Sequence, residues 1–350
     1  MSISSKGSIA LTAKLRAMYG KRLTPQNYKE LLRKQNVSEI AAYLKQQTHY
    51  SDTLQDINEN SVHRGQLENV IRRQLFTDYI KMLNYIGQDE LKFYNFFLKR
   101  IEIDEILSCV RFLITNNTGE YFFSLPSYFV EHAKFDLYGL AKVKTYDELL
   151  NLLSKTPYYA ILKKFDPAAE TKTDMILIEN EFNKYYYSYI FSIIDENFTG
   201  DVRSSIRESF GVEIDLINIT EIIRLKKYFG VKSDLIRPIV LTYYFKIKKA
   251  EIARMIDAPD VETAMQILSG IYYGKYFEQN SFDYIERYSQ QIKYEYNKNL
   301  LAFSTSSSLS VVAYLQLKRL EINNIISILE GVRYGINPSE ISKVLIGPVD

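Results

Sequence analysis

Histidine and cysteine side chains are the first groups to examine for metal or redox chemistry in this chain. The three histidines, His49, His63 and His132, are far apart, and none has a second histidine or cysteine at the spacing of a metal site. The single cysteine, Cys109, falls on the apolar side of a predicted helix, as a core residue does. We therefore expect no metal site, and one cysteine cannot form a disulfide within the chain.

Sequence motifs for nucleotide binding and nucleophilic catalysis are also missing. The chain contains no Gly-x-x-x-x-Gly-Lys-Ser/Thr, no Gly-x-Gly-x-x-Gly and no Gly-x-Ser-x-Gly. The turn Tyr273-Gly274-Lys275 lacks the second glycine and the hydroxyl that hold phosphates. The sequence predicts no cofactor, no small-molecule substrate and no catalytic residue.

Three glutamates, Glu68, Glu179 and Glu286, recur near the starts of three long predicted helices. They could converge as a metal or proton site. However, a carboxylate at a helix start is favoured by the helix dipole without any function, and an active site usually needs unlike groups. We favour a structural role and keep an enzyme with an unfamiliar acidic site as a minor hypothesis.

One predicted helix occurs three times and organises the rest of the chain. Its copies are LKRIEIDEILSCVRF from Leu98, FGVEIDLINITEIIRLKKYFG from Phe210 and LKRLEINNIISILEGVRY from Leu317. With the acid of each copy as position zero, isoleucine follows at plus four and apolar residues at plus seven and plus eight, which form one buried stripe. We expect the acids to begin these helices and to complement the dipole. The acids are Glu102, Asp215 and Glu321, and the isoleucines are Ile106, Ile219 and Ile325.

Each copy has upstream partners at a fixed distance. The three upstream glutamates precede the three acids by 34, 36 and 35 residues, and a short helix ending in a tyrosine-bearing turn lies further upstream. The chain therefore divides into helical repeats at 1–120, 121–235 and 236–350. Strand signals are absent, so we predict an all-α fold with the three repeats related by pseudo-three-fold symmetry in one compact body.

Local signals set several expected boundaries. Thr24 and Pro25 predict a helix start, Ser38 is expected to cap a helix over 39–47, and a separate helix is expected over 89–100. The serine-rich stretch from Ser304 to Ser310 is expected to be a loop.

Charge and hydropathy limit the classes of partner. The chain has 44 basic and 42 acidic residues, for a net charge of +2, without the basic patch of a nucleic-acid-binding protein. No apolar run approaches the roughly 20 residues of a membrane-spanning helix. We expect a soluble or peripheral protein that binds no nucleic acid.

The third copy and the N-terminal region resemble a known family. AYLQLKRLEINNIISILEGVRYGINPSEISKVL, from Ala313, is similar to the C-terminal signature of a central-stalk subunit of V-type and archaeal A-type ATPases, which is the C subunit of prokaryotic enzymes and the d subunit of vacuolar ones. AKLRAMYGKRLTPQNYKELLRKQNVSEIAAYLKQQTHY, from Ala13, resembles the opening of that family. One departure is Thr115, where the other copies have Tyr228 and Tyr334.

This resemblance implies a funnel-shaped, non-catalytic subunit, present once per complex. Its wide cavity would receive the rotor shaft of the soluble ATPase motor, and its opposite end would rest on the membrane proteolipid ring, at the cytoplasmic face. It would pass torque between the motor and the ring for proton or sodium transport. The alternative is a free-standing helical-repeat scaffold for another assembly.

Charged residues near the C-terminal ends of the repeated helices are the candidate partner-binding residues. The cations among them either are solvated groups that complement the helix dipole or contact a partner. At plus nine the type changes from arginine to glutamate in the third copy, as expected of three walls that meet a shaft without three-fold symmetry. The candidates are Arg111, Arg224, Lys226, Lys227, Glu330 and Arg333.

Overall fold

A computed structural model describes residues 5–87, 90–115, 125–165, 172–277 and 284–347. These residues form helices joined by turns, and the described ranges contain no strand, so the predicted all-α class is confirmed. The chain divides into two compact units. The first contains Met1–Gly87 and Ser204–Asp350, and the second contains Gln88–Arg203.

The first unit contains most of the helices. They are α1 (Ser5–Gly20), α2 (Pro25–Leu32), α3 (Val37–Gln47), α4 (Arg64–Leu83), α12 (Ser233–Ile236), α13 (Lys249–Asp257), α14 (Val261–Ser269), the 3-10 helix η3 (Gly274–Tyr276), α15 (Ile285–Phe303), α16 (Ser307–Arg333) and α17 (Pro338–Ser342). The unit also contains all but the first residues of α11 (Gly200–Phe229).

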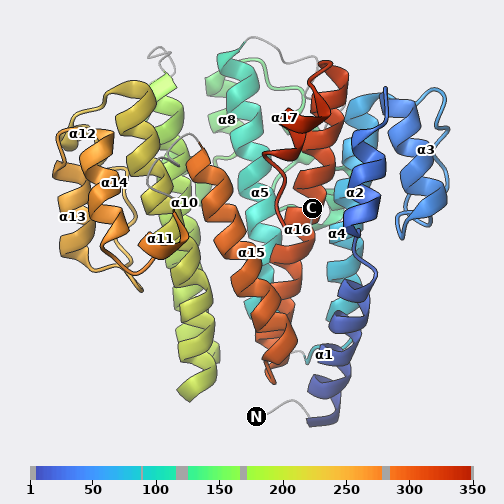
Figure 1. The fold of residues 1–350 in the computed structure, drawn as a ribbon, viewed down its shortest axis with the longest axis horizontal. Helices are drawn as coiled ribbons and strands as arrows, with labels where there is room; N and C mark the ends of the chain where they lie inside the picture. The colour runs from blue at the N-terminus through green and yellow to red at the C-terminus, as the bar shows by residue number, and fades with distance from the viewer. Residues whose placement is uncertain (1–4, 88–89, 116–124, 166–171, 278–283, 348–350) are drawn as a thin grey trace. The chain divides into compact units, whose positions relative to one another are not determined.

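Helix α16 is the centre of the first unit. It packs against α15, α1 and α4 along its length and against the short helices α2, α3 and α17 (Figure 1). Its residues are buried around the whole circumference for much of its length, including Leu315, Ile322 and Leu329. A helix that is apolar on all sides belongs in a core, which explains why several further helices can surround it.

The second unit contains two long helices and a set of short ones. They are α5 (Leu91–Ile114), η2 (Ser127–His132), α7 (Leu137–Leu140), α8 (Tyr146–Leu152), α9 (Tyr158–Leu162) and α10 (Lys172–Asn197). Helices α5 and α10 pack against each other, and α9 packs on α10. Phe93 contributes to this core through ring contacts with Tyr94, Phe96 and Phe198.

The repeated helices are longer than their sequence copies. The expected helix over 89–100, whose first residue lies outside the described ranges, continues from Leu91 into the first copy as the single helix α5, so Glu102 lies in its middle. Asp215 and Glu321 lie in the middle of α11 and α16. The expectation that these acids begin helices is therefore wrong. No glycine or proline interrupts the chain between 91 and 114, so nothing stops the first helix at residue 100.

Helix caps agree with the sequence signals in part. Thr24 caps α2 with Pro25 in the first turn, and Gly200 ends the break before α11 with a φ of 58°. The cap of α3 is Asn36 instead of Ser38, because the Asn36 side chain accepts from the Glu39 N–H. Ser306 caps α16, so the expected loop ends there and Ser307 to Ser310 are helical.

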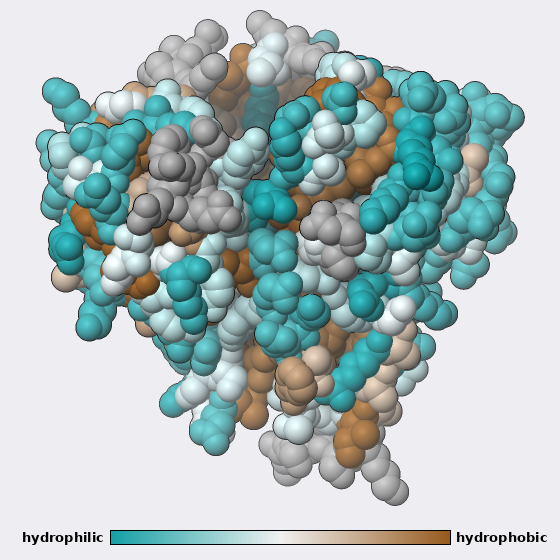
Figure 2. All heavy atoms as spheres, viewed as in Figure 1, coloured by the Kyte–Doolittle hydropathy of each residue, from teal (hydrophilic) through white to brown (hydrophobic). Residues whose placement is uncertain are grey.

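The short helices α2 and α3 bury their apolar residues and expose their polar ones. Residues at the right-hand edge of Figure 2, where α2 and α3 lie, are mostly hydrophilic, and the apolar residues of these helices, Leu31, Ile40 and Leu44, are fully buried. Across the described ranges, the long helices are too polar for any of them to traverse a lipid bilayer.

Candidate functional site

Each of the three mid-helix acids is buried and accepts a hydrogen bond from a tyrosine hydroxyl. We call Glu102, Asp215 and Glu321 the anchor acids; they are 2 %, 1 % and 7 % exposed. Their hydrogen-bond donors, the docking tyrosines, are Tyr158, Tyr273 and Tyr50 respectively. Each docking tyrosine follows a pair of short helices, α7–α8, α13–α14 and α2–α3, so each acid fixes one small helical lobe to a long helix.

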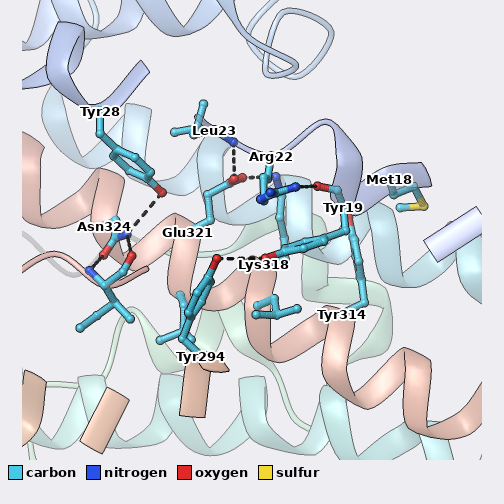
Figure 3. Close-up of a pocket in the computed structure, with 13 residues that line it drawn as sticks. Met18, Tyr19, Arg22, Leu23, Tyr28, Tyr294, Tyr314, Lys318, Glu321 and Asn324 are labelled. Atoms are coloured by element: carbon cyan, nitrogen blue, oxygen red, sulfur yellow. Dashed lines mark hydrogen bonds and ion pairs between the residues drawn. The ribbon is translucent and has the colours of Figure 1, made fainter. Parts of the chain in front are cut away.

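The third anchor site joins the N-terminal region to α16 (Figure 3). Glu321 accepts from the Tyr50 hydroxyl at 2.9 Å and from the backbone N–H of Leu23 at 2.7 Å. The Lys318 ammonium lies 2.6 Å from the same carboxylate and 2.5 Å from Nε2 of His49. Leu23 and Tyr50 flank α2 and α3, so both ends of this lobe are tied to one side chain.

The charge of Glu321 is stabilised although it is buried. Burial by itself would raise the pKa of the carboxyl, but the positive charge of Lys318 and the hydrogen bond from His49 hold it well below the ordinary value of 4.5. Removing one partner from such a buried pair costs about 3–5 kcal/mol, because the other charge is left uncompensated. Glu321 therefore acts as a fixed negative charge that orients its neighbours.

The second anchor site uses backbone donors in place of a lysine. Val212 occupies the position that lysine has in the other two copies. Asp215 accepts from the backbone N–H groups of Phe245, Lys246 and Ile247 at 3.1, 2.7 and 3.3 Å. Burial still raises the pKa of Asp215, against the lowering effect of these backbone donors and of the Tyr273 hydroxyl.

The first anchor site contains a lysine enclosed by tyrosines. Lys99 is 5 % exposed, lies 3.8 Å from Glu102 and sits over the rings of Tyr158, Tyr185 and Tyr189 at 5.3, 5.4 and 4.9 Å. Burial lowers the pKa of Lys99, and Glu102 opposes that effect. The ring faces and the carboxylate together stabilise an ammonium that has left water.

A second polar position repeats at plus three from the acid. The Asn218 side chain donates to the carbonyl of Leu241 at 3.0 Å and accepts from its N–H at 2.8 Å. Asn324 forms the same pair of bonds with Ile346, at 2.7 and 2.9 Å. The first copy has Glu105 at this position. In the second and third copies, one side-chain amide therefore holds the backbone of a later segment beside the helix.

The hydrogen bonds to the docking tyrosines, and not the helix dipole, explain why an acid recurs in each copy. Each acid is selected because a lobe must dock in the middle of a long helix, where a buried carboxylate can accept several donors. The tyrosine turns were visible in the sequence, but the pairing was not predicted. The constant presence of one acid and one tyrosine turn per repeat was the signal that could have revealed it.

The plus-nine residues lie in ion pairs within the chain. Arg111 pairs with Glu179 at 3.8 Å, and Arg224 pairs with Glu286 at 3.0 Å. In the third copy the charges are rearranged: Arg64 lies 2.5 Å from Glu330 and 2.9 Å from Glu68. Arg64 therefore lies between two glutamates, and its single positive charge offsets only part of their combined negative charge.

The other candidate partner-binding residues have varied surroundings. Lys226 is half-buried and donates to the carbonyl of Ala258 at 2.5 Å, which closes the C-terminal part of α11 onto the segment before α14. Lys227 lies 4.8 Å from the ring of Tyr228, and Arg333 lies 5.4 Å from the ring of Tyr334. Both of these tyrosines are more than half exposed.

The upstream glutamates do not share one site. Glu68, Glu179 and Glu286 each face a different arginine, as given above, and the described ranges hold no group of three or more acids, histidines or cysteines that could bind a metal ion. Cys109 is buried, which raises the pKa of its thiol to about 12, so it is protonated at neutral pH.

Comparison with known proteins decides which family this architecture belongs to. The chain matches the family described as ATP synthase (C/AC39) subunit over residues 11–344. This chain belongs to the ATP synthase (C/AC39) subunit family. Members of this C/AC39 family are non-catalytic subunits of A- and V-type ATP synthases, which agrees with buried carboxylates that are engaged in docking contacts.

The chain is similar to the C subunits of A-type ATP synthases from several organisms. It is 26 % identical to the C subunit of the A-type ATP synthase of Methanosarcina acetivorans over 95 % of this chain and 91 % of the relative. It is 29 % identical to the protein of the same name from Methanosarcina mazei over 72 % of this chain and 68 % of the relative. The corresponding protein of Thermococcus kodakarensis is 21 % identical over 96 % of this chain and 89 % of the relative.

Proposed function

We propose that this chain is the central-stalk socket of a rotary A/V-type ATPase, which couples the rotor shaft of the soluble motor to the membrane proteolipid ring for proton or sodium transport. The observation that carries the proposal is the family match, which extends over nearly the whole chain and so includes all three repeated helices. The same match favours this function over a free-standing scaffold.

The anchor sites support the accompanying proposal of three pseudo-three-fold repeats that form a funnel, with repeats at 1–120, 121–235 and 236–350. In the first two copies the docking tyrosine comes from the lobe that follows the helix in sequence. In the third copy the docking tyrosine, Tyr50, comes from the N-terminal lobe. A closed three-membered arrangement requires such a connection between the last and first repeats.

In this function the subunit binds peripherally at the cytoplasmic face, one copy per complex, with the shaft subunits on one side and the proteolipid ring on the other. It transmits torque without chemistry of its own. Torque transmission requires stiffness, and close-packed helices with buried ion pairs supply it.

Reconstitution tests this proposal. Membranes that contain the ring and stator are combined with the soluble motor and shaft, with and without the purified chain. We expect ATP hydrolysis in both samples and ATP-driven ion transport only when the chain is present. Equal ion transport without the chain would disprove the coupling role.

A further inference from the structure

A wide polar groove lies within the first unit, apart from the three anchor carboxylates. Its volume is about 630 Å³, which falls within the range of small-molecule sites. One strip of α1, one strip of α4, the turn after α3 and part of α16 line it. Among the described residues that line it, the apolar or aromatic side chains besides the imidazole of His49 are Met18 and Tyr314, both labelled in Figure 3.

Helical periodicity places cations on the two long sides of the groove. Lys14 and Lys21 are two turns apart on α1 and the turn that follows it, and Arg73 and Lys81 are two turns apart on α4, so each pair projects from one side. Lys14, Lys21, Arg73 and Lys81 are exposed, and none of them pairs with a carboxylate among the described residues. The groove therefore holds four positive charges that form no ion pair within the described part of the chain.

The acids of the groove do not balance these cations. Asp78 is buried and accepts from the Tyr314 hydroxyl at 2.6 Å and from the Gln74 amide at 2.8 Å. Asp52 is the other lining acid. Lys318 adds no free charge because Glu321 neutralises it. The groove is left with a clear excess of positive charge, and the hydroxyl groups of Ser51 and Thr77 lie among the cations. The Thr53 hydroxyl already donates to Gln74.

We propose that this groove binds a compact polyphosphate anion, a short chain of linked phosphates. Cations on two facing helices and hydroxyl donors between them match a ligand that presents acceptor oxygens on all sides. The described lining residues offer no free ring on which a nucleobase could stack. Tyr314 is 3 % exposed and its hydroxyl is bound to Asp78, and the His49 ring already packs 4.3 Å from that of Tyr50. The ligand is therefore recognised through its phosphates.

Calorimetry with sodium tripolyphosphate tests the proposal on the purified full chain. The double variant Lys21→Glu/Lys81→Glu replaces one cation on each side of the groove. The matched control Lys29→Glu/Lys249→Glu makes the same charge change at exposed lysines outside the groove, on α2 and α13. We expect the groove variant to lose at least about tenfold in affinity and the control to stay within about twofold of wild type.

Several results would overturn the proposal. They are no binding to wild type, an equal loss in both variants, binding of poly-glutamate as tight as that of tripolyphosphate, or binding of ATP that is clearly tighter than that of tripolyphosphate. Equal loss would indicate attraction by net charge only, and tight poly-glutamate binding would indicate an acidic polypeptide as the occupant. If the groove variant does not fold, as checked by circular dichroism, Lys21→Gln/Lys81→Gln and Lys29→Gln/Lys249→Gln replace the two variants. The measurement needs no other ATPase subunit, so its outcome does not depend on the coupling function.

Discussion

At the residue scale, the anchor acids differ in how their charge is balanced, and the docking tyrosines should differ in importance accordingly. Tyr50→Phe and Tyr158→Phe each remove one donor to a buried glutamate and should cost about 1.5–3 kcal/mol, as hydrogen bonds to charged groups do. Tyr273→Phe should cost less, because Asp215 keeps three backbone donors. Urea unfolding of the three variants measures the order, and an effect of Tyr273→Phe as large as that of Tyr50→Phe would contradict it.

The depressed pKa of Glu321 leads to a pH-dependent prediction. A carboxyl with a folded-state pKa below its unfolded value of 4.5 contributes stability above pH 4.5 and loses it as pH falls. The difference in unfolding free energy between wild type and Glu321→Gln should therefore be largest near neutral pH and shrink below about pH 4.5.

Asp215 provides the contrasting case. Its folded-state pKa is raised above 3.8, so its contribution falls as pH rises from 3.8 to the folded-state pKa. The difference between wild type and Asp215→Asn should change in the opposite direction with pH. Urea unfolding at a series of pH values measures both, and a pH-independent difference for Glu321→Gln would contradict the assignment of a fixed buried charge.

At the element scale, the apolar stripe of the repeated helices was predicted correctly. Ile106, Ile219 and Ile325 are all fully buried. Truncating any one to alanine should cost about 2–5 kcal/mol, since it leaves a cavity in a packed core. Thermal or urea unfolding measures the loss, and a cost below about 1 kcal/mol at any of the three would show that its surroundings collapse around the smaller side chain.

Helix type and the buried face could be read from the sequence because both depend on local periodicity. Helix lengths and the position of the acids within them could not. Residues 91–100 and the first copy each have their own periodic pattern, and only the absence of a helix breaker joins them into α5. The acids looked like helix starts because a carboxylate there is common, whereas the donors that hold them are distant in sequence: Tyr50 is 271 residues from Glu321.

The exchanged charge at Glu330 gives a prediction about how neighbouring helices are held together. Glu330→Arg would place an arginine beside Arg64 and should destabilise the chain by up to about 1 kcal/mol, as expected for partly exposed charges. Adding Arg64→Ala should recover that loss, because the new arginine could then pair with Glu68 as Arg224 pairs with Glu286. The double-mutant cycle is measured by urea unfolding, and additive effects would show that the three residues are not coupled.

At the scale of the whole molecule, the sequence did not predict that the N-terminal lobe and the C-terminal segment contact the same helix, α16. Tyr50 and Leu23 bind Glu321, and Ile346 binds Asn324, so the N-terminal lobe and the C-terminal segment meet on the same helix. The spacing of motifs in the sequence reveals the repeats but does not show which repeat contacts which. The partner-binding residues remain a prediction for the same reason, since a single chain carries no direct record of its partners.

The last prediction concerns binding of the rotor shaft by residues that also form ion pairs within the chain. Arg224 and Glu330 are 39 % and 29 % exposed at the side chain, so each has an internal partner and a face left for another protein. Exposed pairs contribute little to stability. Reversing both charges, as Arg224→Glu/Glu330→Arg, should therefore leave the subunit folded while weakening its hold on the shaft, and should lower ion pumping more than ATP hydrolysis.

A matched control separates loss of a shaft contact from loss of internal pairs. Arg237→Glu/Glu340→Arg also reverses one arginine and one glutamate and breaks the exposed pairs Arg237–Asp257 and Lys343–Glu340. Calorimetric binding of the purified shaft subunits and coupled ion transport should be close to wild type in this control and reduced in Arg224→Glu/Glu330→Arg. If both variants bind the shaft as wild type does, Arg224 and Glu330 act only within the chain, and the change from arginine to glutamate at plus nine is explained by Arg64 alone.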